Sequence, residues 1–276
     1  MGLNITENFP LKNCTSFRVG GPADRLIIVN SREELAEAMK YPRPVILGNG
    51  TNVLFSDAGY RGTVIKFGPE LSKISIRGTT VKAGAGALFA SVAKAANAKG
   101  LSGLEFACGI PGSVGGAVYM NAGAYDGTVS DVISKVESIP ELKEYGLSYR
   151  HSNFMEQGAI ILGASFKLRH GDQDEINAKI SDFTKRRTTK QPLAFPSAGS
   201  FFKRPEGYFA GKLIEDAGLK GRTVGGAQIS ELHAGFMINI GGATCADIME
   251  LMHIVQSEVY EKFGVRLEPE VRIIEE

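Results

Sequence analysis

Glycine dominates the middle of this sequence and restricts how that part can fold. Four glycines, Gly109, Gly112, Gly115 and Gly116, fall within eight positions, and the wider stretch 103–127 carries almost no charged side chains. Glycine lets the backbone take positive φ angles and approach a ligand closely, so several N–H groups can converge on one anion. Two interpretations stay open on this window: main-chain binding of a large, flat, partly anionic ligand, or a glycine-rich core loop between strands.

Composition limits the class of protein. The chain has 276 residues, 43% hydrophobic and 22% charged, with a net charge of +1. This length allows one large domain or two to three small ones. The near-neutral charge argues against nucleic acid as a partner, and no apolar run approaches the roughly 20 residues of a membrane span. The N-terminus lacks the basic and apolar regions of a signal peptide.

Cysteine and histidine usage adds to this picture. The three cysteines form no Cys-x-x-Cys pair, and the four histidines show no metal-ligand spacing. Sparse, unpaired cysteines fit a reducing compartment. We therefore expect a cytoplasmic protein without a metal site.

Periodicity predicts three blocks of mixed helix and strand: 1–66, 67–187 and 191–264. The clearest helix signals are a capping box at Ser31–Glu34, an apolar stripe including Leu88 and Val92, a helix over 210–217, and a cap at Thr244–Asp247 before a long apolar stripe. A hairpin turn is expected at 77–80. The alternating tail 266–274 is predicted to be a strand.

The segment 48–52, Gly-Asn-Gly-Thr-Asn, follows a buried strand and has the start of a dinucleotide-binding fingerprint. Val53 stands where the third glycine would be needed, so the doubly wound dinucleotide fold is disfavoured. Two interpretations remain here as well: a turn whose N–H groups bind a pyrophosphate, or a plain strand–turn–strand connection.

Three further residues are notable. Arg150 lies in a polar link between strands, Ser200 follows Gly199 in a turn, and Glu270 lies on the polar face of the terminal strand. Each is an ordinary structural residue when taken alone. Arg150 has a chemical alternative, a guanidinium that stabilises an anion, and so does Ser200, a hydroxyl that donates a proton.

Seven short motifs occur together along the chain. They cover residues 13–21, 48–52, 109–116, 121–125, 149–150, 199–203 and 267–270. In content and order they resemble the UDP-N-acetylenolpyruvoylglucosamine reductase (MurB) family. The resemblance extends over nearly the whole chain, and the short connection at 186–199 is similar to that of the family's shorter, type II members.

The resemblance implies an α+β fold: a vanillyl-alcohol-oxidase-type FAD-binding module of two subdomains, 1–66 and 67–187, and a smaller substrate-binding domain, 191–264. It also implies that a C-terminal strand, 267–276, packs back on the first subdomain. It implies reduction of a UDP-sugar enolpyruvyl ether, with NADPH as hydride donor, non-covalent FAD as cofactor, no metal, and a monomer as the favoured state.

The resemblance also implies roles for individual residues. The catalytic residues would be Arg150, Ser200 and Glu270. The FAD contacts would be Gly48, Asn49, Gly50, Thr51, Asn52, Gly109, Ile110, Pro111, Gly112, Ser113, Gly115, Gly116 and Arg187. Candidates for contacting the nucleotide substrates are Tyr149, Lys190, Arg204, Arg222 and Gln228.

Two other functions remain open from the sequence. One is a different flavoenzyme of the same cofactor-binding type, such as a sugar or alcohol oxidase, in which flavin is often attached covalently. The other is a flavin- or nucleotide-binding module without turnover. The joint presence of Arg150, Ser200 and Glu270 argues against the second.

Overall fold

The computed structural model describes residues 2–275. Residue contacts divide the chain into two compact units, and each is built from separate segments. Unit 1 comprises Met1–Ile5, Leu26–Asn49 and Val64–Arg187, and unit 2 comprises Thr6–Arg25, Gly50–Thr63 and Thr188–Glu276. The sequence-based boundaries 1–66, 67–187 and 191–264 stay a prediction.

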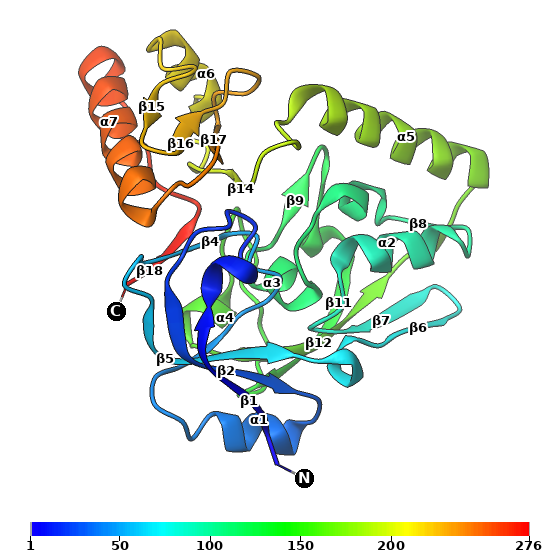
Figure 1. Cartoon of the computed structure of the whole chain (residues 1–276). Helices are drawn as coiled ribbons and strands as arrows, with labels where there is room; N and C mark the ends of the chain where they lie inside the picture. The colour runs from blue at the N-terminus through cyan, green and yellow to red at the C-terminus, as the bar shows by residue number, and fades with distance from the viewer. Residues whose placement is uncertain (1, 276) are drawn as a thin grey trace. The chain divides into compact units, whose positions relative to one another are not determined.

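One sheet contains the strands that lead from one unit into the other. Its order is β1 (Asn4–Pro10), β2 (Pro22–Val29), β5 (Tyr60–Phe67) and β3 (Pro44–Ile46) (Figure 1). Helix α1 (Arg32–Ala38) connects β2 to β3. It begins where predicted, because the Ser31 side chain accepts a hydrogen bond from the N–H of Glu34. Leu35 and Ala38 of α1 are buried in one cluster with Ile27 and Ile65.

The main sheet of unit 1 is antiparallel, in the order β11 (Ile133–Ile139), β12 (Ile160–Lys167), β7 (Thr80–Gly84) and β6 (Ile74–Arg77). Arg77 pairs with Thr80, so the predicted hairpin is confirmed. Helices α2 (Phe89–Asn97) and α3 (Val114–Tyr119) contribute buried residues to the core of this unit.

One sequence expectation in this region is wrong, and one helix was not predicted. Leu88 does not belong to the buried stripe of α2, because it is the N-cap residue and 45% of its surface is exposed. The glycine-rich stretch is not purely loop, since α3 begins within it. The Ser113 side chain caps α3, and Val114, Ala117 and Val118 bury one face of it, which offsets the low helix propensity of its two glycines.

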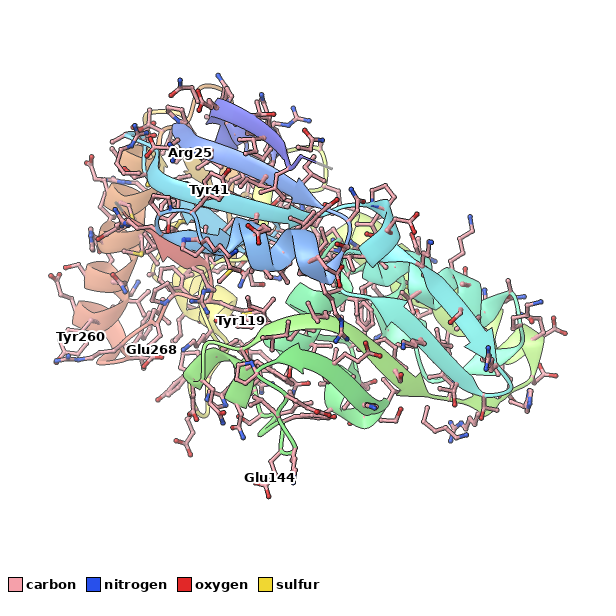
Figure 2. All side chains as sticks on the ribbon, turned by 90° about the horizontal axis from the view of Figure 1, so that it is seen from below. Arg25, Tyr41, Tyr119, Glu144, Tyr260 and Glu268 are labelled. Carbon is pink, nitrogen blue, oxygen red and sulfur yellow. The ribbon has the colours of Figure 1, made fainter. Side chains whose placement is uncertain are left out.

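The other elements of this part of the chain are short, apart from α5. They are β8 (Leu101–Ser102) paired with β13 (Arg169–His170), β9 (Gly123–Ala124) paired with β10 (Gly127–Thr128), α4 (Asn153–Glu156), α5 (Gln173–Lys190), and four 3₁₀ helices, η1 (Leu11–Asn13), η2 (Pro69–Ser72), η3 (Glu105–Gly109) and η4 (Val129–Asp131). Helix α5 ends at Lys190, so it continues past residue 187, where the sequence placed the end of the second block. The connection before α4 projects outward, with Glu144 at its tip (Figure 2).

Unit 2 contains a second antiparallel sheet, in the order β14 (Ser197–Ser200), β17 (Phe236–Asn239), β16 (Ala227–Ile229) and β15 (Thr223–Val224). Helices α6 (Ala210–Asp216) and α7 (Cys245–Phe263) pack with it around one hydrophobic core. Figure 1 shows both helices beside this sheet. A separate parallel pair joins β4 (Val53–Phe55) to β18 (Arg272–Ile274).

Helix α7 follows its sequence pattern closely. Thr244 and Asp247 form the expected capping box, the predicted apolar stripe from Ile248 to Val259 is buried, and Gly264 ends the helix with a φ of 68°. A contact from a distant segment adds to the cap, because the Asp57 carboxylate accepts hydrogen bonds from the N–H groups of Cys245 (2.7 Å) and Ala246 (2.9 Å). No helix among residues 2–275 is long and apolar enough to cross a membrane.

Candidate active site

Two of the predicted cofactor loops lie against each other inside unit 1. The Asn49 side-chain amide donates to the carbonyl of Pro111 (2.6 Å), and Lys66 Nζ donates to the carbonyl of Gly48 (2.6 Å). A side chain at Gly48 would place its Cβ 2.4 Å from Ser113 Oγ. The structure therefore brings residues 48–49 and 109–116 together, although they are separated in the sequence.

Close packing within the protein explains several of the glycines. A Cβ at Gly115 would lie 3.0 Å from Ala85 Cβ, and one at Gly109 would lie 2.9 Å from Arg187 Cδ. At these positions and at Gly48, glycine therefore avoids close contacts with protein neighbours, a reason that the sequence did not show. Gly116 differs, because its nearest neighbour would be Ser113 Oγ at 3.4 Å.

The N–H groups of these loops test whether a phosphate fits. Those of Val114 and Gly115 donate to the carbonyls of Ala87 and Ala85. Among the described residues of unit 1, those of Gly48, Asn49, Gly112 and Ser113 have no acceptor. Neighbouring N–H groups that have no protein acceptor form a typical anion-binding concavity. The donor set fits the diphosphate of FAD.

Arg187 lies at the end of this unit beside Gly109, in a group that also contains Cys108 and Tyr125. Burial lowers the pKa of the Arg187 guanidinium, while Tyr125 and Cys108 favour its charged form. The Tyr125 ring stacks on Phe183 at 4.3 Å between centroids, and its hydroxyl donates to the Phe183 carbonyl (2.7 Å). Tyr125 belongs to the motif at 121–125, but no role in a site was predicted for it from the sequence.

Arg150 occupies a strained position in a tight turn. Its φ is 54°, a left-handed value that is uncommon outside glycine, and Ser148 bridges to His151 around it. Its guanidinium lies 5.1 Å from the centre of the Tyr149 ring, and Nη2 donates to the carbonyl of Gly123 in β9 (3.3 Å). Tyr149 itself is 55% exposed. The turn directs Arg150 towards β9.

Unit 2 brings Ser200 and Glu270 together through their main chains. Ser200 ends β14 opposite Phe236, after Gly199 with a φ of 80°. The next residue, Phe201, accepts a hydrogen bond at its carbonyl from the N–H of Glu270 (2.8 Å). Phe202 then bridges to Pro269. Two residues that lie 70 positions apart in the numbering are thereby held on adjacent segments.

The remainder of the segment 48–52 is anchored in unit 2. Gly50 has a φ of 66°, and a Cβ there would lie 2.0 Å from the carbonyl oxygen of Cys14, so only glycine fits. Ser16 donates from its N–H to the Gly50 carbonyl (2.9 Å) and from Oγ to the Ser197 carbonyl (2.6 Å). The Asn52 amide donates to the carbonyl of Glu270 (3.1 Å). Thr51 lies between these anchored residues.

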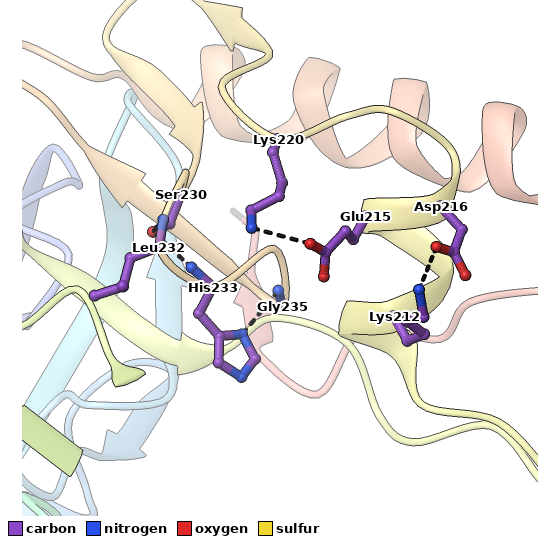
Figure 3. A network of polar contacts seen from close by, with 8 residues as sticks. All are labelled: Lys212, Glu215, Asp216, Lys220, Ser230, Leu232, His233 and Gly235. Atoms are coloured by element: carbon purple, nitrogen blue, oxygen red, sulfur yellow. Dashed lines mark hydrogen bonds and ion pairs between the residues drawn. The ribbon is translucent and has the colours of Figure 1, made fainter. Parts of the chain in front are cut away.

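A polar turn that contains Ser230, His233 and Gly235 contacts the segment after Ser200; Figure 3 shows the hydrogen bond between Gly235 and His233 within this turn. The His233 ring accepts a hydrogen bond at Nδ1 from the N–H of Gly235 (3.1 Å), and the Gly235 carbonyl accepts from the N–H of Phe201 (2.9 Å). Burial lowers the pKa of His233; the nearby charge of Lys220 lowers it further and that of Glu215 opposes this. The hydrogen bond from Gly235 requires an unprotonated Nδ1.

The candidate substrate contacts in unit 2 come from separate segments of the chain. Arg222 and Gln228 belong to the same hairpin, since Thr223 pairs with Gln228. Arg204 lies over the Phe209 ring at 4.0 Å and donates to the Tyr208 carbonyl (3.3 Å). Lys190 is the last residue of α5. Among residues 2–275, no group of His, Cys, Asp or Glu side chains is arranged to hold a metal ion.

Comparison with known proteins decides the family. The UDP-N-acetylenolpyruvoylglucosamine reductase from Alkaliphilus oremlandii is 49% identical over 280 residues, covering 97% of this chain and 92% of the relative. The enzyme of the same name from Clostridium beijerinckii is 50% identical over 270 residues, covering 93% of this chain and 88% of the relative. The chain belongs to the UDP-N-acetylenolpyruvoylglucosamine reductase family.

Domain families and a solved structure agree with this assignment to the reductase family. Residues 23–140 match the FAD binding domain, and residues 191–274 match the C-terminal domain of UDP-N-acetylenolpyruvoylglucosamine reductase. The crystal structure of the reductase (MurB) from Thermus caldophilus has a TM-score of 0.86 at 36% identity and covers 99% of both chains. The predicted family and the α+β FAD-binding fold are confirmed. The roles of single residues stay predictions.

Proposed function

We propose that this chain reduces the enolpyruvyl ether of UDP-N-acetylglucosamine to UDP-N-acetylmuramate, a peptidoglycan precursor, as an FAD-containing oxidoreductase that uses NADPH. The observation that carries this proposal is the near-full-length similarity to reductases of that name, at 49% identity over 97% of this chain. The site contributes a second line of support, because Ser200 and Glu270 lie on adjacent segments of unit 2.

The loops of unit 1 supply groups that suit the cofactor. The N–H groups of Gly48, Asn49, Gly112 and Ser113 would hold its phosphates, and Arg187 would add a positive charge. Bound FAD supplies the chemistry of hydride transfer, which no amino-acid side chain provides. The polypeptide therefore has to bind and orient the reactants, stabilise developing charge, and deliver a proton.

Reduction of the enolpyruvyl group adds a hydride to one carbon and a proton to its neighbour. Negative charge develops on the substrate carboxylate before the proton arrives, so groups that stabilise only that state accelerate the reaction. In this proposal Arg150 donates hydrogen bonds to the carboxylate, and Glu270 does so when its carboxyl group is protonated. Ser200 Oγ gives its proton to the neighbouring carbon and regains one from solvent.

Cations and exposed polar groups would bind the nucleotide parts of the substrates. Arg204, Arg222 and Lys190 suit the diphosphates of NADPH and the UDP-sugar, because guanidinium and ammonium groups form charge-assisted hydrogen bonds with phosphate oxygens. Tyr149 and Gln228 would contribute further contacts. We also propose that the enzyme works in the cytoplasm as a monomer; the three free cysteines support a reducing compartment.

Anaerobic stopped-flow absorbance of the purified protein tests the function. The protein is mixed first with NADPH and then with enolpyruvyl-UDP-N-acetylglucosamine, while the visible flavin absorbance is followed. We expect NADPH to bleach the flavin and the UDP-sugar to restore the colour. Bleaching without recovery would remove the substrate from the proposal, and rapid recovery with oxygen instead would favour an oxidase. Bound flavin that NADPH never bleaches would favour a binding module.

A further inference from the structure

The short parallel ladder between β4 and β18 has an unusual end. Val53 pairs with Arg272, and the N–H of Arg272 donates to the carbonyl of Asn52 (3.0 Å). In a regular parallel ladder, a residue's carbonyl accepts from one residue of the partner strand, and its N–H donates to the carbonyl that lies two positions earlier on that same partner strand. The regular partner for the Asn52 N–H is therefore the carbonyl of Glu270.

The side chain of Asn52 makes this contact in place of its main chain. Its Nδ2 donates to the Glu270 carbonyl at 3.1 Å. Within the described residues of unit 2, the main-chain N–H of Asn52 has no acceptor. The amide thus completes the ladder and leaves the main-chain N–H of Asn52 outside it. Aspartate lacks the donor, serine is too short, and glutamine is one methylene longer, so asparagine fits this geometry.

The result is that Glu270 is held from both sides. Its N–H donates to the Phe201 carbonyl (2.8 Å), and its carbonyl accepts from Asn52. Phe201 directly follows Ser200. Since the peptide groups before and after the Glu270 Cα are both bonded, the direction of its Cα–Cβ bond relative to the segment after Ser200 is restrained.

We propose that Asn52 is a positioning residue for Glu270. Through Glu270, its side chain affects the half-reaction in which the UDP-sugar is reduced. This role goes beyond the FAD contact that the resemblance implied for Asn52. The inference rests on the proposed function, because it assumes that Glu270 acts on the UDP-sugar. It does not depend on a cofactor contact by the Asn52 side chain.

Asn52→Ala tests the proposal, and Gln256→Ala is its matched control. The Gln256 amide donates to the carbonyl of Leu267 (2.9 Å), so the control removes the same kind of bond from the same segment, three residues before Glu270. For Asn52→Ala we expect reoxidation of reduced flavin by the UDP-sugar to slow about tenfold, the loss of roughly one net hydrogen bond. Flavin reduction by NADPH should slow less than reoxidation, so that the two half-reactions separate, and Gln256→Ala should show no such split.

A second measurement needs neither substrate nor cofactor. Hydrogen–deuterium exchange of the apoprotein should be faster in peptides covering 268–273 in Asn52→Ala, and in Asn52→Ser if the alanine variant does not fold. Exchange that matches the wild type would overturn the proposal. So would equal losses in both half-reactions together with weaker FAD binding, which would leave Asn52 as a cofactor ligand only. If the UDP-sugar does not reoxidise the wild-type enzyme, the proposed function fails, and the exchange experiment still decides whether Asn52 holds Glu270.

Discussion

Ser200 is the residue whose role is most directly testable. It is exposed at the end of β14, so removing its hydroxyl does not open a cavity in the core. We expect Ser200→Ala to reduce flavin normally with NADPH but to be reoxidised by the UDP-sugar about 10²–10⁴-fold more slowly, the usual contribution of a positioned proton donor. Stopped-flow absorbance measures both steps. Parallel losses in both would indicate a structural role for Ser200.

Glu270 permits a comparison of two substitutions. Glu270→Gln keeps a hydrogen-bond donor of nearly the same shape, whereas Glu270→Ala removes the group. If the carboxyl group stabilises charge by donating a hydrogen bond, the glutamine variant should keep more of the reoxidation rate than the alanine variant. Single-turnover rates at saturating UDP-sugar measure the difference. Equal losses would argue against the donor role, and unchanged rates would remove Glu270 from the catalytic residues.

At the scale of the element, α7 shows how a distant segment stabilises a helix. Asp57 accepts from two N–H groups at its first turn, where a negative charge is also favourable. We expect Asp57→Ala to lower the free energy of unfolding by about 1–2 kcal/mol, as for loss of a strong N-cap. Urea denaturation of the apoprotein measures it. Asp57→Asn retains one acceptor oxygen, so its free energy of unfolding should decrease less. If both variants were as stable as the wild type, the capping role of Asp57 would be contradicted.

The same helix shows what the sequence could predict and why. Its cap, buried stripe and final glycine all depend on residues within a few positions of one another, so local pattern was sufficient. The contact from Asp57 depends on tertiary structure and left no local signal. The prediction that Leu88 belongs to the buried stripe was wrong for a related reason. An apolar residue at the start of a helix fits the helical periodicity even when it lies outside the buried face.

The candidate site divides in the same way. The order of the motifs was sufficient to select Ser200 and Glu270, but not to find that Phe201 and Asn52 hold Glu270 by its main chain. Any residue other than proline offers the same main-chain N–H and C=O groups. Contacts to these groups therefore leave no pattern in the sequence. The packing reason for Gly48 and Gly109 was missed because the neighbours, Ser113 and Arg187, are remote in sequence.

At the scale of the whole molecule, we expect the lowered pKa of His233 to make the stability of the protein depend on pH. Its pKa in the folded protein lies below the ordinary 6.5, mainly because of burial. As the pH falls below 6.5, the unfolded chain takes up a proton that the folded chain does not, so the free energy of unfolding decreases until the folded-state pKa is also passed.

His233→Asn keeps a side-chain acceptor for the Gly235 N–H but does not titrate. Urea denaturation at about pH 7.5 and about pH 5.5 should therefore show a larger loss of stability in the wild type than in this variant, because only the wild type has the histidine contribution. Comparing the two proteins removes the contribution of carboxyl groups common to both. An identical loss in both would show that His233 titrates alike in the folded and unfolded states.

The segmented make-up of unit 2 bears on how this protein can change over generations. Residues 191–274 match a recognised C-terminal domain, yet β18 needs β4 as its partner, α7 needs Asp57, and Glu270 needs Asn52. All three partners precede residue 64. In the sequence, the segment Val64–Arg187 of unit 1 therefore separates them from the C-terminal part of unit 2. A gene fragment for the C-terminal stretch would thus lack parts of its own fold. Recombination that exchanged that stretch between distant relatives would have to preserve these partners as well.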